Sequence, residues 1–83
     1  MEYLVTSPAQ LGQLARGVRK CRRLTQAQMA ARVGVRQKAV SLFETDPAHF
    51  TLERLFKMLT ALEFELVLRE KHPPSEASGQ GDW

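Results

Sequence analysis

The sequence predicts an all-α fold of four to five helices, followed by one short strand and a disordered tail. Helix-capping residues at Ser7, Thr25 and Thr51 indicate where three of the helices begin. Apolar residues recur about every 3.6 positions up to residue 62, whereas over residues 64–70 they alternate as in a strand. A chain of 83 residues forms one small domain, which buries only about 60% of its unfolded surface. We therefore expect a second source of stability, and dimerisation is the natural one.

The first helix is predicted to begin after Ser7, because proline follows at the first helical position and Gln10 lies three residues beyond the cap. It should end near Arg22. Its inward-facing stripe is predicted to contain Leu11, Leu14, Ala15, Val18 and either Cys21 or Arg22. The residues expected to stay in water are Arg16, Arg19, Lys20 and Arg23.

The second helix should begin at Thr25, which forms a capping box with Gln28. Its buried residues are expected to be Met29, Ala30 and Val33. Gly34 should end this helix, since glycine readily adopts the left-handed conformation that turns the chain sharply. The third helix is predicted from about Arg36 to Phe43, with Val35, Ala39, Val40 and Phe43 facing inward. Two short helices joined by a glycine turn form a helix-turn-helix.

Residues 45–50 are expected to form a loop, because the Asp46-Pro47 pair marks a turn and disfavours helix at the residue before the proline. Thr51 should cap a fourth helix. Its apolar stripe, expected to cover the first helices from behind, is Leu52, Leu55, Phe56, Leu59 and Leu62.

The segment 64–70 is the predicted strand. Phe64, Leu66 and Leu68 alternate with Glu65, Val67 and Arg69, which favours one buried face. A strand needs a partner, and within the chain only the segment 3–5 is a weak candidate. We therefore predict that this segment pairs with its copy in a second subunit, in an antiparallel sheet. The dimerisation residues would be Phe64, Leu66, Val67 and Leu68.

The charge of the chain is unevenly distributed. Residues 1–43 carry eight basic side chains and one acidic one, whereas residues 44–83 carry four basic and eight acidic ones. A polyanion should therefore dock on the N-terminal half. The alternative is a basic helix face that is merely solvated.

The start of the third helix carries the residues best suited to DNA. A short polar helix fits the major groove, and free N–H groups at a helix N-terminus bind phosphate. Gln37 can pair with adenine, and Arg36 and Lys38 can reach guanine or a phosphate. The predicted base-reading residues are Arg36, Gln37, Lys38 and Ser41. The predicted phosphate contacts are Gln26, Arg22, Arg23 and Arg32. The alternative roles are capping of the second helix for Gln26, plain exposure for Ser41 and solvation for Arg36.

Nothing in the sequence indicates an enzyme, a metal or a cofactor. Cys21, His49 and His72 fall in three different elements without the spacing of metal ligands. Glu44 is expected to cap a helix or pair with a nearby arginine. No signal peptide or membrane span is visible. A single cysteine suits a reducing compartment, so we expect a cytoplasmic protein.

The polar residues 72–83 should form a flexible tail after a domain of residues 1–71. The tail ends in Trp83, which could anchor in a pocket of a partner protein because tryptophan is enriched at binding hot spots. The alternative is an aromatic residue that is exposed by chance.

The order of these motifs resembles the Cro/C1-type (XRE) helix-turn-helix family over residues 7–62. The family motifs are Leu24-Thr25-Gln26, Val33-Gly34-Val35, Phe43-Glu44 and the run from Thr51 to Leu55. The Ser-Pro-x-Gln-Leu opening, the Arg-Gln pair of the third helix, the strand and the tail ending in tryptophan extend the likeness to the antitoxins of HipBA toxin–antitoxin modules. Many XRE proteins have serine or threonine where this chain has Arg36, so water or DNA must satisfy the start of that helix.

The resemblance implies a homodimeric, operator-binding autorepressor that complexes and neutralises a HipA-like serine/threonine kinase. It also implies that Trp83 docks on the kinase. Because the two-fold symmetry of a dimer imposes the same symmetry on DNA, the operator should be an inverted repeat with half-sites about one helical turn apart or a multiple of it, and the protein should associate with the nucleoid when it is bound there. Two alternatives are a phage-type or restriction-controller repressor without a toxin, and a protein-interaction module on the same fold.

Overall fold

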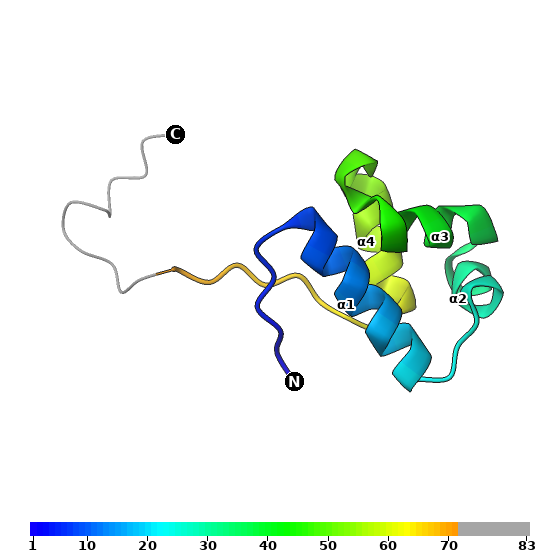
Figure 1. Ribbon diagram of the computed structural model, residues 1–83, viewed down its shortest axis with the longest axis horizontal. Coiled ribbons are helices and arrows are strands. Elements are labelled where there is room, and N and C mark those ends of the chain that lie inside the picture. The colour runs from blue at the N-terminus through cyan, green and yellow to red at the C-terminus, as the bar shows by residue number, and fades with distance from the viewer. Residues whose placement is uncertain (72–83) are drawn as a thin grey trace.

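The computed structural model describes residues 1–71, which form four α-helices and one short 3₁₀-helix. The elements are α1 (Pro8–Cys21), α2 (Gln26–Val33), α3 (Gln37–Thr45), η1 (Pro47–His49) and α4 (Leu52–Ala61). Figure 1 shows α2 and α3 at one end of the molecule, while residues 64–71 lead away on the opposite side. The all-α prediction is confirmed for this part of the chain. No helix within it is long and apolar enough to cross a membrane.

The three predicted helix starts are confirmed by side-chain caps. The Ser7 hydroxyl accepts from the Gln10 amide at 3.2 Å, and the Thr51 hydroxyl accepts from the Arg54 amide at 3.2 Å. The capping box of α2 is complete, because Thr25 Oγ1 accepts from the Gln28 backbone amide at 3.0 Å and the Gln28 side chain accepts in return at 2.9 Å. Each such cap contributes about 1 kcal/mol.

The turn between α2 and α3 depends on Gly34, as predicted. Its φ of 70° and ψ of 33° lie in the left-handed region, where a side chain is strained. The Val35 amide then donates to the Ala30 carbonyl at 3.1 Å and closes the end of α2. The following helix begins at Gln37 and ends at Thr45, two residues later than predicted.

The core lies between the four α-helices and centres on Phe43, which is fully buried and packs on the Phe50 ring at 5.4 Å. The other buried apolar residues of the core cluster are Ala15, Val18, Met29, Ala30, Val40, Met58, Ala61 and Leu62.

The predicted inward face of α4 was partly wrong. Leu52 is 64% exposed and Phe56 is 45% exposed, whereas Met58 and Ala61 are buried. The inward-facing stripe is Leu55, Met58, Leu59 and Leu62, which has the 3-1-3 spacing of one helix face. The predicted stripe omitted Met58 and Ala61 and included Leu52 and Phe56, which lie toward the solvent side of the helix.

The helix α1 approaches α3 very closely at Gly12. A Cβ atom on this glycine would lie 2.5 Å from the Glu44 carbonyl oxygen and 3.1 Å from the Phe43 carbonyl oxygen. The first distance is shorter than any real Cβ contact and the second is unusually tight, so glycine permits this spacing of the two helix backbones. On the same helix, Cys21 is exposed and belongs to neither the core nor a disulfide.

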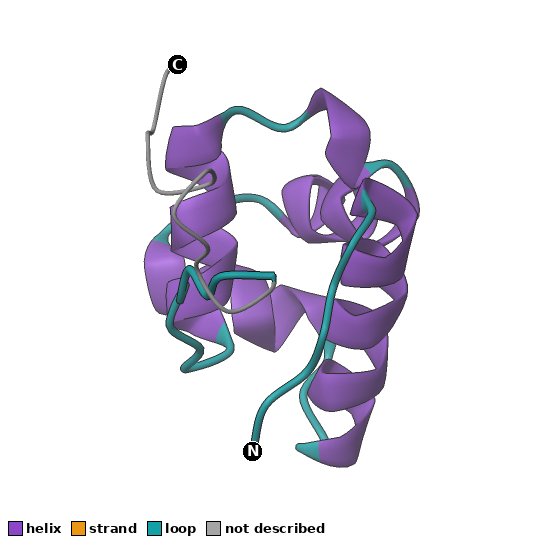
Figure 2. Cartoon of the chain, turned by 90° about the vertical axis from the view of Figure 1, so that its left-hand side faces the viewer, coloured by secondary structure: helices purple, strands orange, loops and turns teal. Residues whose placement is uncertain are grey.

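The Phe64 amide donates to the Leu59 carbonyl at 2.8 Å, at the end of α4. Residues 65–70 form neither helix nor strand in the single chain, and Figure 2 shows only helices and loops among the described residues. Phe64 is half-buried and lies against Tyr3, with 6.0 Å between the centres of the two rings. Beyond it Leu66, Val67 and Leu68 are 51%, 71% and 92% exposed. Pairing with a second subunit stays a prediction. The tail of residues 72–83, with His72 and Trp83, lies outside the described residues.

Candidate DNA-binding surface

The start of α3 is open to solvent and carries the predicted base-reading residues. Arg36 occupies the N-cap position and forms no side-chain cap, as expected from the absence of serine or threonine there. Arg36, Gln37 and Lys38 are all exposed, and Ser41 lies half-buried one turn later. The first N–H groups of the helix therefore remain available to an acceptor from outside the protein.

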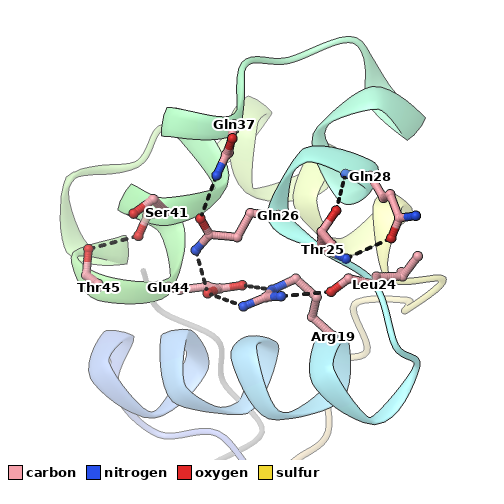
Figure 3. Close-up of polar contacts among 9 residues, drawn as sticks. All are labelled: Arg19, Leu24, Thr25, Gln26, Gln28, Gln37, Ser41, Glu44 and Thr45. Atoms are coloured by element: carbon pink, nitrogen blue, oxygen red, sulfur yellow. Dashed lines mark hydrogen bonds and ion pairs between the residues drawn. The ribbon is translucent and has the colours of Figure 1, made fainter.

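A buried ion pair lies behind this surface (Figure 3). Arg19 Nε donates to Glu44 Oε2 at 2.6 Å, and Arg19 Nη2 donates to Glu44 Oε1 at 3.2 Å. The guanidinium also donates to the Leu24 carbonyl at 2.8 Å, which ties α1 to the turn before α2. The two side chains are only 9% and 2% exposed.

Two glutamines connect this pair to the surface. Gln26 Nε2 donates to Glu44 Oε1 at 3.1 Å, and Gln37 Nε2 lies 3.4 Å from Gln26 Oε1 (Figure 3). The structure thus brings together Gln26, a predicted phosphate contact, and Gln37, a predicted base reader. The contact between the two glutamines is the longest hydrogen bond in the series that runs from the core to the start of α3.

The prediction that Arg19 stays in water was wrong, whereas the expected pairing of Glu44 with an arginine is confirmed. A signal for the buried pair exists in the sequence. Arg19 continues the inward spacing of Ala15 and Val18, and Glu44 continues that of Val40 and Phe43. An acid and a base at inward positions of two helices indicate a buried pair, since a lone buried charge is costly.

Two of the predicted phosphate contacts have structural partners that sequence reasoning missed. Arg22 Nη1 donates to the Leu62 carbonyl, and the Arg22 guanidinium lies 5.3 Å from the centre of the Phe64 ring. Arg32 Nη1 donates to the Ala61 carbonyl at 3.1 Å. Both arginines therefore satisfy carbonyl groups at the C-terminal end of α4, which have no partner within the helix.

Arg23 and His49 both lie at the surface. Arg23 is exposed, with a φ of 57° that places it in the turn between α1 and α2. His49 is exposed and lies 2.8 Å from Asp46 within η1 and its cap. Among residues 1–71, no three histidine, cysteine, aspartate or glutamate side chains gather where they could hold a metal ion.

The fold and the open start of α3 define a helix-turn-helix protein, and residues 16–68 match the helix-turn-helix family model HTH_3. More particularly, the chain belongs to the HipB antitoxin family. It is 34% identical to antitoxin HipB of Escherichia coli O6:H1 over 79 residues, which cover 94% of this chain and 84% of that protein. It is 32% identical to antitoxin HipB of Escherichia coli K12 over 82 residues, covering 95% and 93%.

Solved structures agree with this assignment. The chain superposes on a protein of a HipA–HipB–O2–O3 complex with a TM-score of 0.80 and 32% identity, over 86% of this chain and all of that one. A HipB–O4 20mer complex gives a TM-score of 0.80 and 32% identity over the same shares. The family resemblance of the sequence is thereby confirmed, and membership in a family of regulators supports the expectation that the chain is not an enzyme.

Proposed function

We propose that the protein is a dimeric antitoxin and autorepressor, which binds its own operator and neutralises a HipA-like serine/threonine kinase. The observation that carries the proposal is the uncapped, exposed start of α3, where Gln37 is linked through Gln26 to a buried ion pair. Relatives more than 30% identical are HipB antitoxins, and one similar structure is a HipA–HipB–O2–O3 complex. The protein would act in the cytoplasm, at the nucleoid when it is bound to its operator.

In this proposal α3 enters the major groove of the operator with its N-terminus leading. Gln37 pairs with adenine N6 and N7, while Arg36 and Lys38 contact guanine or phosphate and Ser41 contacts a base or a phosphate. The free N–H groups and the helix dipole add attraction for phosphate. The proposed phosphate contacts remain Gln26, Arg22, Arg23 and Arg32, of which Arg22 and Arg32 also stabilise the end of α4.

The exposed segment 64–70 supports the proposed dimer. Leu66, Val67 and Leu68 leave apolar surface in water, and an extended segment without a partner leaves its backbone groups unpaired. Antiparallel pairing with a second copy would bury the apolar side chains and give the backbone groups hydrogen-bond partners. We expect a dimer in sedimentation equilibrium at micromolar concentration, and a monomer there would contradict the shared sheet. Two-fold symmetry then requires an inverted-repeat operator with half-sites about one helical turn apart, or a multiple of it.

Replacing Gln37 with alanine should weaken operator binding by about 1–3 kcal/mol and relax specificity at one base position. The reason is that alanine loses both hydrogen bonds to the base while leaving the phosphate contacts intact. Fluorescence anisotropy at about 150 mM salt, against the DNA upstream of the gene and a random duplex, measures the effect. Gln13→Ala on the exposed side of α1 is the control. Equal losses on both duplexes would remove Gln37 from the reading set.

The proposed contact with the kinase lies on the tail, residues 72–83, with Trp83 as its anchor. We expect that removing these residues weakens binding to the kinase at least about tenfold, since a buried tryptophan is often a hot spot. Calorimetry with the kinase-like product of the neighbouring gene measures the change, and operator binding should be unaffected. Unchanged kinase affinity would place the contact on residues 1–71 instead.

A further inference from the structure

The buried carboxylate of Glu44 fixes the direction of every hydrogen bond around it. An ionised carboxylate only accepts hydrogen bonds, and an arginine only donates them. Glu44 accepts two from Arg19. The neighbouring Gln26 therefore has one favourable orientation, with its NH₂ group toward Glu44 at 3.1 Å. The reverse orientation would place two acceptor oxygens against each other beside a buried carboxylate, which costs the hydrogen bond.

The orientation of Gln26 decides what it offers to Gln37. With its NH₂ group turned to the core, its Oε1 atom points to the surface and accepts from Gln37 Nε2 at 3.4 Å. One N–H of Gln37 is thereby used. Figure 3 shows the nitrogen of the Gln37 amide turned toward Gln26 and its oxygen turned away. That oxygen is left as an acceptor, and the second N–H is left as a donor.

One acceptor beside one donor is the complement of adenine. Adenine offers the N6 amino group as a donor and N7 as an acceptor in the major groove, whereas guanine offers two acceptors, O6 and N7. A glutamine that is free to reverse its amide can adapt to either base, since its two N–H groups also satisfy guanine. A glutamine held in one orientation cannot.

We propose that Glu44 is a specificity-determining residue, which acts through Gln26 to hold the amide of Gln37 in the orientation that selects adenine over guanine. Glu44 is a positioning residue, because it is only 7% exposed and therefore lies behind the surface, out of reach of a base. The inference rests on the proposed reading of adenine by Gln37 and deepens it, since it names the residue that causes the preference for adenine over guanine.

The test compares two duplexes that differ only at the position identified with Gln37→Ala, one with adenine there and one with guanine. The measured quantity is the ratio of the two dissociation constants, because a general loss of affinity leaves this ratio unchanged. In Gln26→Met the relay is broken while the ion pair stays intact, and we expect the adenine preference to fall at least about fivefold. Gln13→Met is the matched control, with an unchanged ratio.

Glu44→Gln tests the carboxylate itself. Its new amide can donate to Gln26, which allows both glutamines to reverse, so the preference should shift toward guanine by about fivefold or more. If this variant unfolds, the double variant Arg19→Met with Glu44→Leu removes the carboxylate without leaving a lone charge, and we again expect a reduced adenine preference.

An unchanged ratio in Gln26→Met, or in a folded variant without the Glu44 carboxylate, would overturn the inference. The proposed function would survive that result if the unmodified protein still prefers its operator. Absence of any operator preference in the unmodified protein would instead refute the proposed function. The two failures are therefore distinguishable in one set of titrations.

Discussion

Replacing Arg19 with methionine is expected to lower the free energy of unfolding by about 3–5 kcal/mol, because it leaves the Glu44 carboxylate buried without its partner. The Glu44 side chain is only 2% exposed in the pair, so water cannot replace the guanidinium. Stability on the order of 4–12 kcal/mol is typical of a domain of this length. The substitution should therefore remove a large share of it, as urea unfolding followed by circular dichroism will measure.

The control for this experiment removes both charges. In Arg19→Met with Glu44→Leu, apolar side chains of similar size replace the pair, and such replacements are often neutral or stabilising. We expect this double variant to recover most of the loss. Arg16→Met, on the exposed side of the same helix, should change stability by less than about 0.5 kcal/mol. A single variant at Arg19 as stable as the unmodified protein would show that the pair is dispensable.

Replacing Gly12 with alanine should destabilise the protein by about 1–3 kcal/mol through overpacking. The added methyl group would lie 2.5 Å from the Glu44 carbonyl oxygen, and a backbone atom within a helix cannot move aside alone. The whole of α1 must shift from α3. For a domain of this size a loss of 1 kcal/mol lowers Tm by roughly 4–8 °C, so thermal unfolding resolves the effect.

Gly17 provides the matched comparison, because a Cβ atom there meets nothing within 4 Å. Gly17→Ala should raise stability by about 0.5–1 kcal/mol, since alanine restricts the unfolded chain and favours the helix. The same chemical change, five residues apart in one helix, is thus expected to have opposite signs. Equal Tm values for the two variants would contradict the close approach of α1 and α3.

The helix starts could be predicted from the sequence because their causes are local. Ser7, Thr25 and Thr51 each cap an amide within three residues of themselves, and Gly34 turns the chain by its own conformation. The inward face of α4 could not be read so simply. Leu52, at the start of this helix, is apolar and yet exposed to solvent. Which residues of α4 lie inside is determined by the neighbouring helices.

Part of the candidate site could likewise be predicted from the sequence, and part could not. Exposure of Arg36, Gln37 and Lys38 follows from their place at the start of a short helix, so sequence reasoning reaches it. The pair of Arg19 and Glu44 joins residues 25 positions apart, and it forms only when α1 packs on α3. The assumption that every charged residue is exposed to solvent therefore fails to predict this pair. The alternation of apolar residues in segment 64–70 leads to the prediction of a shared sheet, and that pairing stays a prediction because a strand forms only against a partner.

The end of α4 has a consequence for operator choice. Arg22 from α1 and Arg32 from α2 hold carbonyls of Leu62 and Ala61, and Arg22 also stacks on Phe64. The direction in which the segment 64–70 leaves is therefore fixed against both helices that precede α3. If this segment forms the proposed dimer, the same contacts set the distance between the two copies of α3. Changes at these two arginines would then alter the half-site spacing while leaving the proposed base-reading residues untouched.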